Sequence, residues 1–138
     1  MFIFILSALS FGYAQTSPQA IDIRNFPLQN IAGRGPLLPL LARDADGSII
    51  SFTIKSLPTP GAGTLTLGGT GVTTGQFLTP SEAKQLQFAP VLGYVGNATF
   101  SYSASDNAGL SSSNATFTIP ILPAGAATVC TTGKLNSN

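Results

Sequence analysis

The stretch "NATFSYSASD", residues 97–106, alternates apolar and polar side chains along its length. Phe100, Tyr102 and Ala104 fall on one side of this alternation, and the serines and threonine between them fall on the other. Successive side chains of a β-strand point to opposite faces, so a period of two predicts a strand with one buried face. The later stretch "NATFTIPIL", residues 114–122, has the same period and predicts a second strand of this kind.

Three further stretches alternate in the same way, and turn signals rich in glycine and proline separate them. They are "SIISFTIKSL" (48–57), "GTLTLGG" (63–69) and "QLQFAP" (85–90). The other residues expected on buried faces are Ile50, Phe52, Ile54, Leu65, Leu67, Leu86, Phe88, Ala115, Phe117, Ile119 and Ile121. Two weaker strand candidates lie upstream, "IDIRNF" (21–26) and "LLPLLA" (37–42), and Pro39 would confine the second to an edge or a bulge. Short strands at this spacing predict an all-β fold, a β-sandwich of about seven strands.

One segment breaks the alternation. In "LTPSEAKQLQF", residues 78–88, Thr79 can cap a helix, Pro80 suits the first helical position, and Glu82 lies three residues after the cap. This spacing is that of a capping box, in which the two side chains bond each other's backbone amides. It predicts one short helical turn near Pro80–Lys84.

The composition excludes several classes of function. The chain has 138 residues, enough for one domain with a sizeable core, and its six basic and five acidic residues are spread out. No basic patch therefore indicates nucleic acid. Charged residues make up 8% of the chain, against about a quarter in ordinary globular domains, and Ser and Thr provide the polar surface instead, as suits an extracellular β-domain. Because the chain contains no histidine, no Ser-His or Cys-His pair exists, and we expect no catalytic residues and no cofactor for catalysis.

The N-terminal stretch "MFIFILSALSFGYAQ", residues 1–15, is typical of an export signal. Gly12 and Ala14 place small residues at the two positions that a signal peptidase inspects, which predicts a signal peptide over residues 1–14. The alternative, a membrane anchor, needs about 20 apolar residues, and this run is shorter. We therefore expect a secreted, extracellular protein, with no membrane span in the mature chain.

The rest of the chain divides into three parts. Residues 15–29 are an N-terminal segment or the first strand, residues 30–122 hold the predicted sandwich, and residues 123–138 are a tail or the start of a following segment. Cys130, in this last part, is the single cysteine, so no disulfide can form within the chain.

Three consecutive stretches carry a resemblance to a known family. They are "ARDADGSIISFTIKSLP", "GTLTLGGTGVTTGQFLTPSEAKQLQFAP" and "GYVGNATFSYSASDNAGLSSSNATFTIPI". Together, from about Asn30 to Leu122, they resemble one cadherin-like, immunoglobulin-like repeat of very large surface proteins of Gram-negative bacteria. The resemblance implies an immunoglobulin/cadherin-like β-sandwich and a multi-repeat stalk or adhesin.

The resemblance also implies calcium ligands at three acidic residues of the repeat, which here are Asp44, Asp46 and Asp106. Calcium takes six to eight oxygen ligands, and loops at one end of a sandwich can bring carboxylates together. The other interpretation is that these residues only form turns. Asp and Asn before glycine bond their own backbone, and Gly47 would then supply a positive φ. Both interpretations fit the sequence.

Three functions from different classes follow. The first is a structural or adhesive surface module whose partners are a protein or glycan at a cell surface, or neighbouring repeats. The second is a carbohydrate-binding or accessory module of an exported enzyme, which the absence of tryptophan disfavours. The third is a subunit of a surface filament in which the strand around Ile21–Phe26 is exchanged between copies, although the same residues also suit the domain's own first strand.

Overall fold

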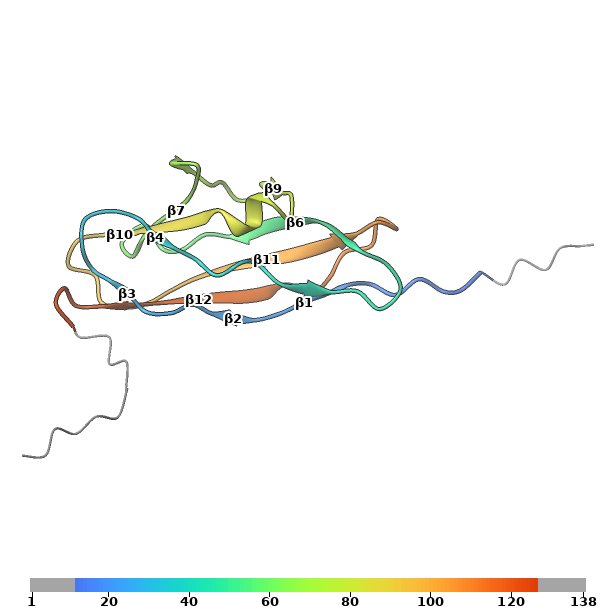
Figure 1. Cartoon of the computed structure of the whole chain (residues 1–138), viewed down its shortest axis with the longest axis horizontal. Helices are drawn as coiled ribbons and strands as arrows, with labels where there is room; N and C mark the ends of the chain where they lie inside the picture. The colour runs from blue at the N-terminus through green and yellow to red at the C-terminus, as the bar shows by residue number, and fades with distance from the viewer. Residues whose placement is uncertain (1–11, 127–138) are drawn as a thin grey trace, which may run out of the picture.

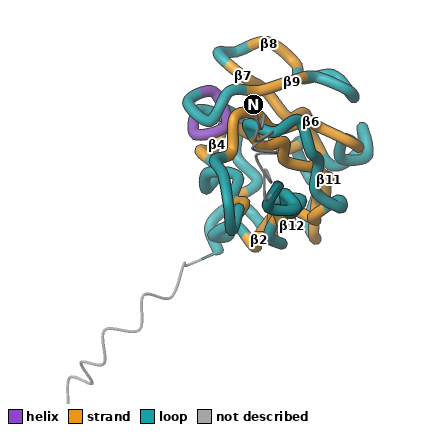
Figure 2. Tube along the Cα trace, turned by 90° about the vertical axis from the view of Figure 1, so that its right-hand side faces the viewer, coloured by secondary structure: helices purple, strands orange, loops and turns teal. Residues whose placement is uncertain are grey.

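The computed structural model describes residues 12–126, which form two main β-sheets lying against each other (Figures 1 and 2). The larger sheet has six strands in the order β2-β12-β11-β6-β9, with β3 also paired to β12. Its strands are β2 (Ile23–Arg24), β3 (Leu28–Gln29), β6 (Ile49–Ser56), β9 (Phe77–Leu78), β11 (Gly96–Asp106) and β12 (Ala115–Leu122).

The smaller main sheet has four strands in the order β4-β10-β7-β8. These are β4 (Gly35–Pro36), β7 (Gly63–Leu67), β8 (Thr70–Gly71) and β10 (Leu86–Pro90). A separate antiparallel pair joins β1 (Gln19–Ala20) to β5 (Ala42–Arg43). This arrangement confirms the predicted all-β sandwich. The strands outnumber the seven expected because the N-terminal part of the chain is broken into two-residue pieces.

The alternating stretches supply the core, as their period of two predicted. Side chains from both sheets meet in one apolar cluster, and almost all the expected residues are buried there. Burying this much apolar surface is the main favourable term in folding. The most deeply buried large side chains of the cluster are Ile54, Leu65, Leu78, Leu86, Phe88, Phe100, Tyr102, Phe117, Ile119 and Ile121.

The prediction for Ile50 is wrong, because this side chain is 53% exposed. Ser51 pairs with Ser105 of β11, and Ile49 pairs with the next residue of β11, so Ile50 is the extra residue of a β-bulge. A bulge interrupts the alternation, so Ile50 is exposed while Ile49 before it packs against the core and Phe52 and Ile54 after it stay buried. A period of two cannot show where such an insertion falls.

The predicted helical turn is present as η1 (Glu82–Lys84), a single 3₁₀ turn. The amide of Thr79 donates to Glu82 Oε2 at 2.8 Å, and the amide of Glu82 donates to Thr79 Oγ1 at 3.2 Å. These reciprocal bonds confirm the capping box. The bond from the Thr79 amide lowers the pKa of the Glu82 carboxyl.

Residues 15–29 were left by the sequence as an N-terminal segment or the first strand. Within them, β1, β2 and β3 all pair with other strands of the same chain. β2 runs parallel to β12, with Ile23 opposite Phe117, and β3 continues the parallel pairing, with Leu28 opposite Ile121. Pro27 lies between these two strands and has no amide hydrogen to donate. The segment "LLPLLA" forms no strand between β4 and β5, although Leu40 is buried in the core.

The hydroxyl of Tyr102 connects the centre of β11 to the β1–β5 pair. It lies 2.5 Å from the carbonyl oxygen of Ile21 and 3.0 Å from that of Leu41, and it accepts a bond from the Leu41 amide at 3.3 Å. The ring is fully buried and packs edge-on against Phe52. Burial raises the pKa of this phenol, so its contribution to stability is complete below the ordinary tyrosine value near 10 and is lost as pH rises through the folded value.

We expect Tyr102→Phe to lower the free energy of unfolding by about 1–3 kcal/mol, because it removes the partner of the Ile21 carbonyl and the Leu41 amide in a partly buried part of the domain. Urea unfolding followed by circular dichroism measures this. Tyr94→Phe is the control: it removes one solvent-facing bond, to the Asn97 carbonyl at 2.9 Å, and should change stability by less than about 0.5 kcal/mol. Equal losses in the two variants would show that the Tyr102 hydroxyl is not structurally important.

Candidate functional site

The three aspartates expected to bind calcium lie in loops at the pole where the chain enters the domain, to the right in Figure 1. Asp44 and Asp46 are in the turn between β5 and β6, and Asp106 is the last residue of β11. The two loops are joined by their backbones: the Asn107 amide donates to the Ser48 carbonyl at 3.0 Å. The predicted convergence of the two loops is therefore present.

The carboxylate of Asp106 is occupied by its own loop. Its Oδ1 atom accepts the amides of Ala108 at 2.9 Å and Leu110 at 2.8 Å, and the residue is 1% exposed. The bond to the residue two positions later defines an Asx turn. Buried carboxylates need such partners, since an unsatisfied one costs several kcal/mol. Asp106 thus has the turn-forming role that the second interpretation assigned to it.

The carboxylate of Asp46 holds the incoming segment instead. Its Oδ2 accepts the Thr16 amide at 2.8 Å, and its Oδ1 accepts the Thr16 hydroxyl at the same distance. The bond from the Thr16 amide is the main reason that the pKa of Asp46 is lowered. This contact is therefore complete above the ordinary aspartate pKa and is lost as pH falls through the lowered value. Asp46 fixes the direction in which the chain enters the domain.

Asp44 is the least satisfied of the three. Its Oδ1 accepts the Asp46 amide at a long 3.4 Å, and its buried Oδ2 has no hydrogen-bond partner within the described part of the chain. That oxygen faces Gly47, where an added Cβ would lie 2.6 Å from it and 2.4 Å from Asn107 Oδ1. Asn107 Oδ1 in turn accepts the Ser48 amide at 2.9 Å.

Gly47 is therefore required for a reason that differs from the prediction. Its φ is not among the positive values found at residues 12–126, so the expected positive φ is wrong. The glycine is needed because two side-chain oxygens approach its Cα from the neighbouring turn and hairpin. Only the folded structure brings Asn107 to this point.

As they stand, these oxygens do not fit a calcium ion. Calcium takes six to eight oxygens, and here four of the six carboxylate oxygens already accept hydrogen bonds: both of Asp46, Oδ1 of Asp106 and, at a long distance, Oδ1 of Asp44. Only the Oδ2 atoms of Asp44 and Asp106 are left among the described residues, too few for a calcium ion. Within residues 12–126, no group of three or more His, Cys, Asp or Glu side chains could hold a metal. The geometry favours the turn interpretation for Asp106, whereas Asp46 binds Thr16 and the buried Oδ2 of Asp44 has no partner in the described part of the chain.

We expect the melting temperature to be the same, within about 1 °C, in excess calcium and in EDTA, since binding at a hundred times the dissociation constant would add about 2.7 kcal/mol and several degrees. Thermal unfolding of the full chain measures this. A calcium-dependent rise that disappears in Asp44→Asn would contradict the turn interpretation and establish the predicted metal site. Asp22→Asn, a carboxylate outside these loops, is the control.

The two packed sheets form an immunoglobulin-like β-sandwich, and the aspartates of its loops bond backbone groups of the same domain. The sequence model of the bacterial Ig domain family matches residues 18–120, most of the chain. The chain therefore belongs to the bacterial Ig domain family. A comparison with curated proteins gave no match. The family match begins upstream of β1, so it includes the strands that the sequence alone left open.

Two buried asparagines that hold the connections of the N-terminal strands are not predicted by the sequence pattern. Asn25 and Asn30 are 4% and 6% exposed and bond backbone groups from several loops. Asn25 occupies a buried position of the alternating stretch that includes Ile23, and only its polar character hides this from a pattern of apolar residues. No helix among residues 12–126 is long and apolar enough to cross a membrane.

Proposed function

We propose that this chain is a non-catalytic, load-bearing module of an extracellular bacterial surface protein. The observation that carries the proposal is the pairing of the N-terminal strands β2 and β3 with the last strand, β12. β2 and β3 run parallel to β12, so the chain enters beside the start of β12 and leaves at its end, at the opposite pole (Figure 1). A module with its two ends at opposite poles extends a chain in a line.

Parallel pairing determines how tension would act on the domain. Force applied through the two ends pulls β2 and β3 in one direction and β12 in the other, along the strand axis. The bonds between them, such as Asn25 N to Thr118 O and Asn30 N to Leu122 O, both 2.8 Å, then share the load. If the ends lay at the same pole, these bonds would break one after another. The topology therefore supports a mechanical role.

Side-chain bonds strengthen the same region. Asp22 Oδ1 accepts the Thr116 amide at 2.7 Å near the start of β12. At the other end, Gln29 Nε2 donates to the Ala126 carbonyl at 2.8 Å and fixes the chain as it leaves. Together with the Asp46–Thr16 contact, these bonds hold both connections to the body of the domain.

Single-molecule pulling tests the mechanical role. One handle is attached before Gln15 and the other on Cys130. We expect an unfolding force severalfold higher than with the second handle on Ser113→Cys in a Cys130→Ser chain. Ser113 is exposed and precedes the start of β12, so the second geometry opens the β2–β12 pair from one end. Equal melting temperatures show that the handles leave stability unchanged. Equal forces in the two geometries would refute the load-bearing role.

The extracellular location rests on the signal-like stretch, of which residues 1–11 lie outside the described residues. We expect the full chain, expressed in a Gram-negative bacterium, to be exported and to begin at Gln15, as N-terminal sequencing would show. Ala14→Phe should block cleavage, because a bulky side chain replaces a small one that the peptidase inspects. Phe11→Leu, at a position not inspected, is the control. An uncleaved chain retained in the cell would contradict export.

A further inference from the structure

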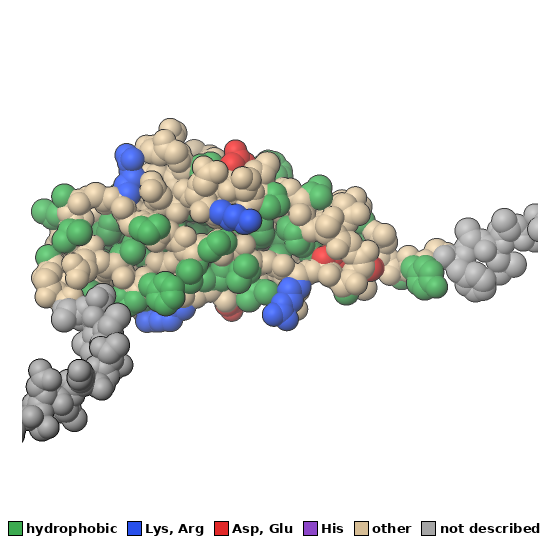
Figure 3. All heavy atoms as spheres, viewed as in Figure 1, with side chains coloured by type: hydrophobic (Ala, Val, Ile, Leu, Met, Phe, Trp, Pro, Cys, Tyr) green, Lys and Arg blue, Asp and Glu red, His purple; other side chains and the backbone are tan. Residues whose placement is uncertain are grey.

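The pole where the chain leaves the domain carries an unusual number of exposed apolar side chains. Leu92 is 73% exposed, Ile31 55% and Val95 54%. Together with Ala32, Pro123 and Ala124 they surround a shallow hollow of about 520 Å³ at this pole. We call these six residues the exit pole. Hydrophobic side chains are visible at this end of the molecule in Figure 3.

The exit pole is held in place by hydrogen bonds rather than formed by chance exposure of a loose loop. Asn30, 6% exposed, accepts the Gly93 amide at 3.0 Å and donates to the Val91 carbonyl at 3.0 Å and to the Tyr94 carbonyl. The Tyr94 amide closes the turn by donating to the Val91 carbonyl at 3.0 Å. Because Asn30 fixes the backbone of this loop, Leu92 and Val95 are held facing solvent.

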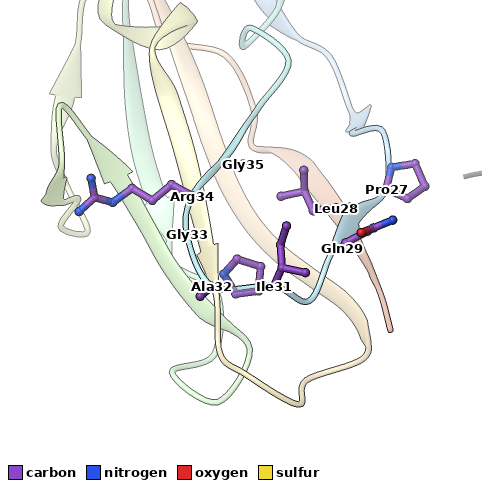
Figure 4. A pocket seen from close by; sticks show the side chains of 9 residues that line it. Pro27, Leu28, Gln29, Ile31, Ala32, Gly33, Arg34 and Gly35 are labelled. Atoms are coloured by element: carbon purple, nitrogen blue, oxygen red, sulfur yellow. The ribbon is translucent and has the colours of Figure 1, made fainter. Parts of the chain in front are cut away.

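The loop between β3 and β4 forms the other side of the exit pole. Figure 4 shows Ile31 and Ala32 in this loop, with Arg34 directed away from them toward β8. The backbone amide of Asn30, at the start of this loop, donates to the Leu122 carbonyl at 2.8 Å, so the loop is joined to the last residue of β12. The exit pole is thus preorganised, uncharged and apolar, as a docking surface is.

The path of the chain indicates which segment could fill the hollow of the exit pole. Pro123 and Ala124 line the hollow themselves, and a turn closed by the Ala126 amide on the Pro123 carbonyl, 3.1 Å, redirects the chain beside it. Gln29 then holds the Ala126 carbonyl. Twelve residues follow, and the apolar pair Val129–Cys130 begins three residues after Ala126, within roughly 10 Å of chain.

The size of the surface points to the same occupant. A few exposed aliphatic side chains offer on the order of a few hundred Å², whereas stable complexes between separate chains bury about 1,200–2,000 Å² in total. A segment joined covalently to the pole has an effective concentration in the millimolar range, so a small contact is sufficient. We propose that the segment after Ala126, through Val129 and Cys130, docks in the hollow of the exit pole.

Such docking would set the direction in which the chain continues beyond the domain. It does not depend on the load-bearing role, because it concerns the unloaded protein and is measured without force.

The reaction of Cys130 with a disulfide reagent tests the proposal in the full chain. The thiolate attacks the reagent's disulfide, a mixed disulfide forms and the reagent's thiolate leaves, so the released chromophore reports the rate. We expect the native chain to react at least tenfold more slowly than the chain unfolded in urea, because docking covers the thiol. Leu92→Ser combined with Val95→Ser should bring the native rate close to the unfolded one.

Ile50→Ser is the matched control, since Ile50 is 53% exposed but lies by the other pole, in the bulge next to Asp106. It should leave the rate of Cys130 unchanged. Circular dichroism confirms that each variant is folded. A native rate equal to the unfolded rate would overturn the proposal. So would protection that increases with protein concentration, which would make the occupant a second copy of the chain.

Discussion

The buried hydroxyl of Tyr102 is the contact on which the rest of the sandwich depends. The β1–β5 pair lies apart from both main sheets, and a two-residue ladder is too short to be stable alone. Tyr102 supplies the missing attachment because its hydroxyl reaches both strands' connections, at Ile21 and Leu41. This places the entering chain correctly for β2 to begin its parallel pairing with β12. A phenylalanine would fill the same volume without fixing that path.

Asn25 and Asn30 bind backbone groups where the edge strand beside β12 is interrupted, after β2 and after β3. The backbone amide of Asn25 donates to the Thr118 carbonyl of β12, and its side-chain Oδ1 accepts the Leu38 amide at 2.8 Å. Asn25 thus joins the larger sheet to the segment that follows β4. Asn30 performs the corresponding task after β3. An asparagine side chain offers donors and an acceptor without a charge, so it can satisfy several buried backbone groups at low desolvation cost.

Particular residues show how far the sequence predicts this fold. Phe100, Tyr102 and Phe117 were correctly placed in the core, because alternation is a local property of the chain. Thr79 and Glu82 were correctly paired for the same reason, since three residues separate them. Ile50 was misplaced and the role of Gly47 was misjudged, because both depend on residues of β11 and its hairpin far along the chain. The pairing of residues 23–29 stayed open because their partner strand, β12, lies about ninety residues later.

This domain has few charged residues, and neutral amides and hydroxyls make most of the contacts that hold its loops. With 8% charged residues, the turns, the strand attachments and the exit pole are all held by neutral donors and acceptors or by carboxylates bonded to backbone amides. Salt screens interactions between exposed charges and acts much less on buried hydrogen bonds. A domain built this way keeps the same geometry at both poles when the ionic strength of its surroundings changes. That property would suit the proposed load-bearing module, whose entering and leaving directions must stay fixed.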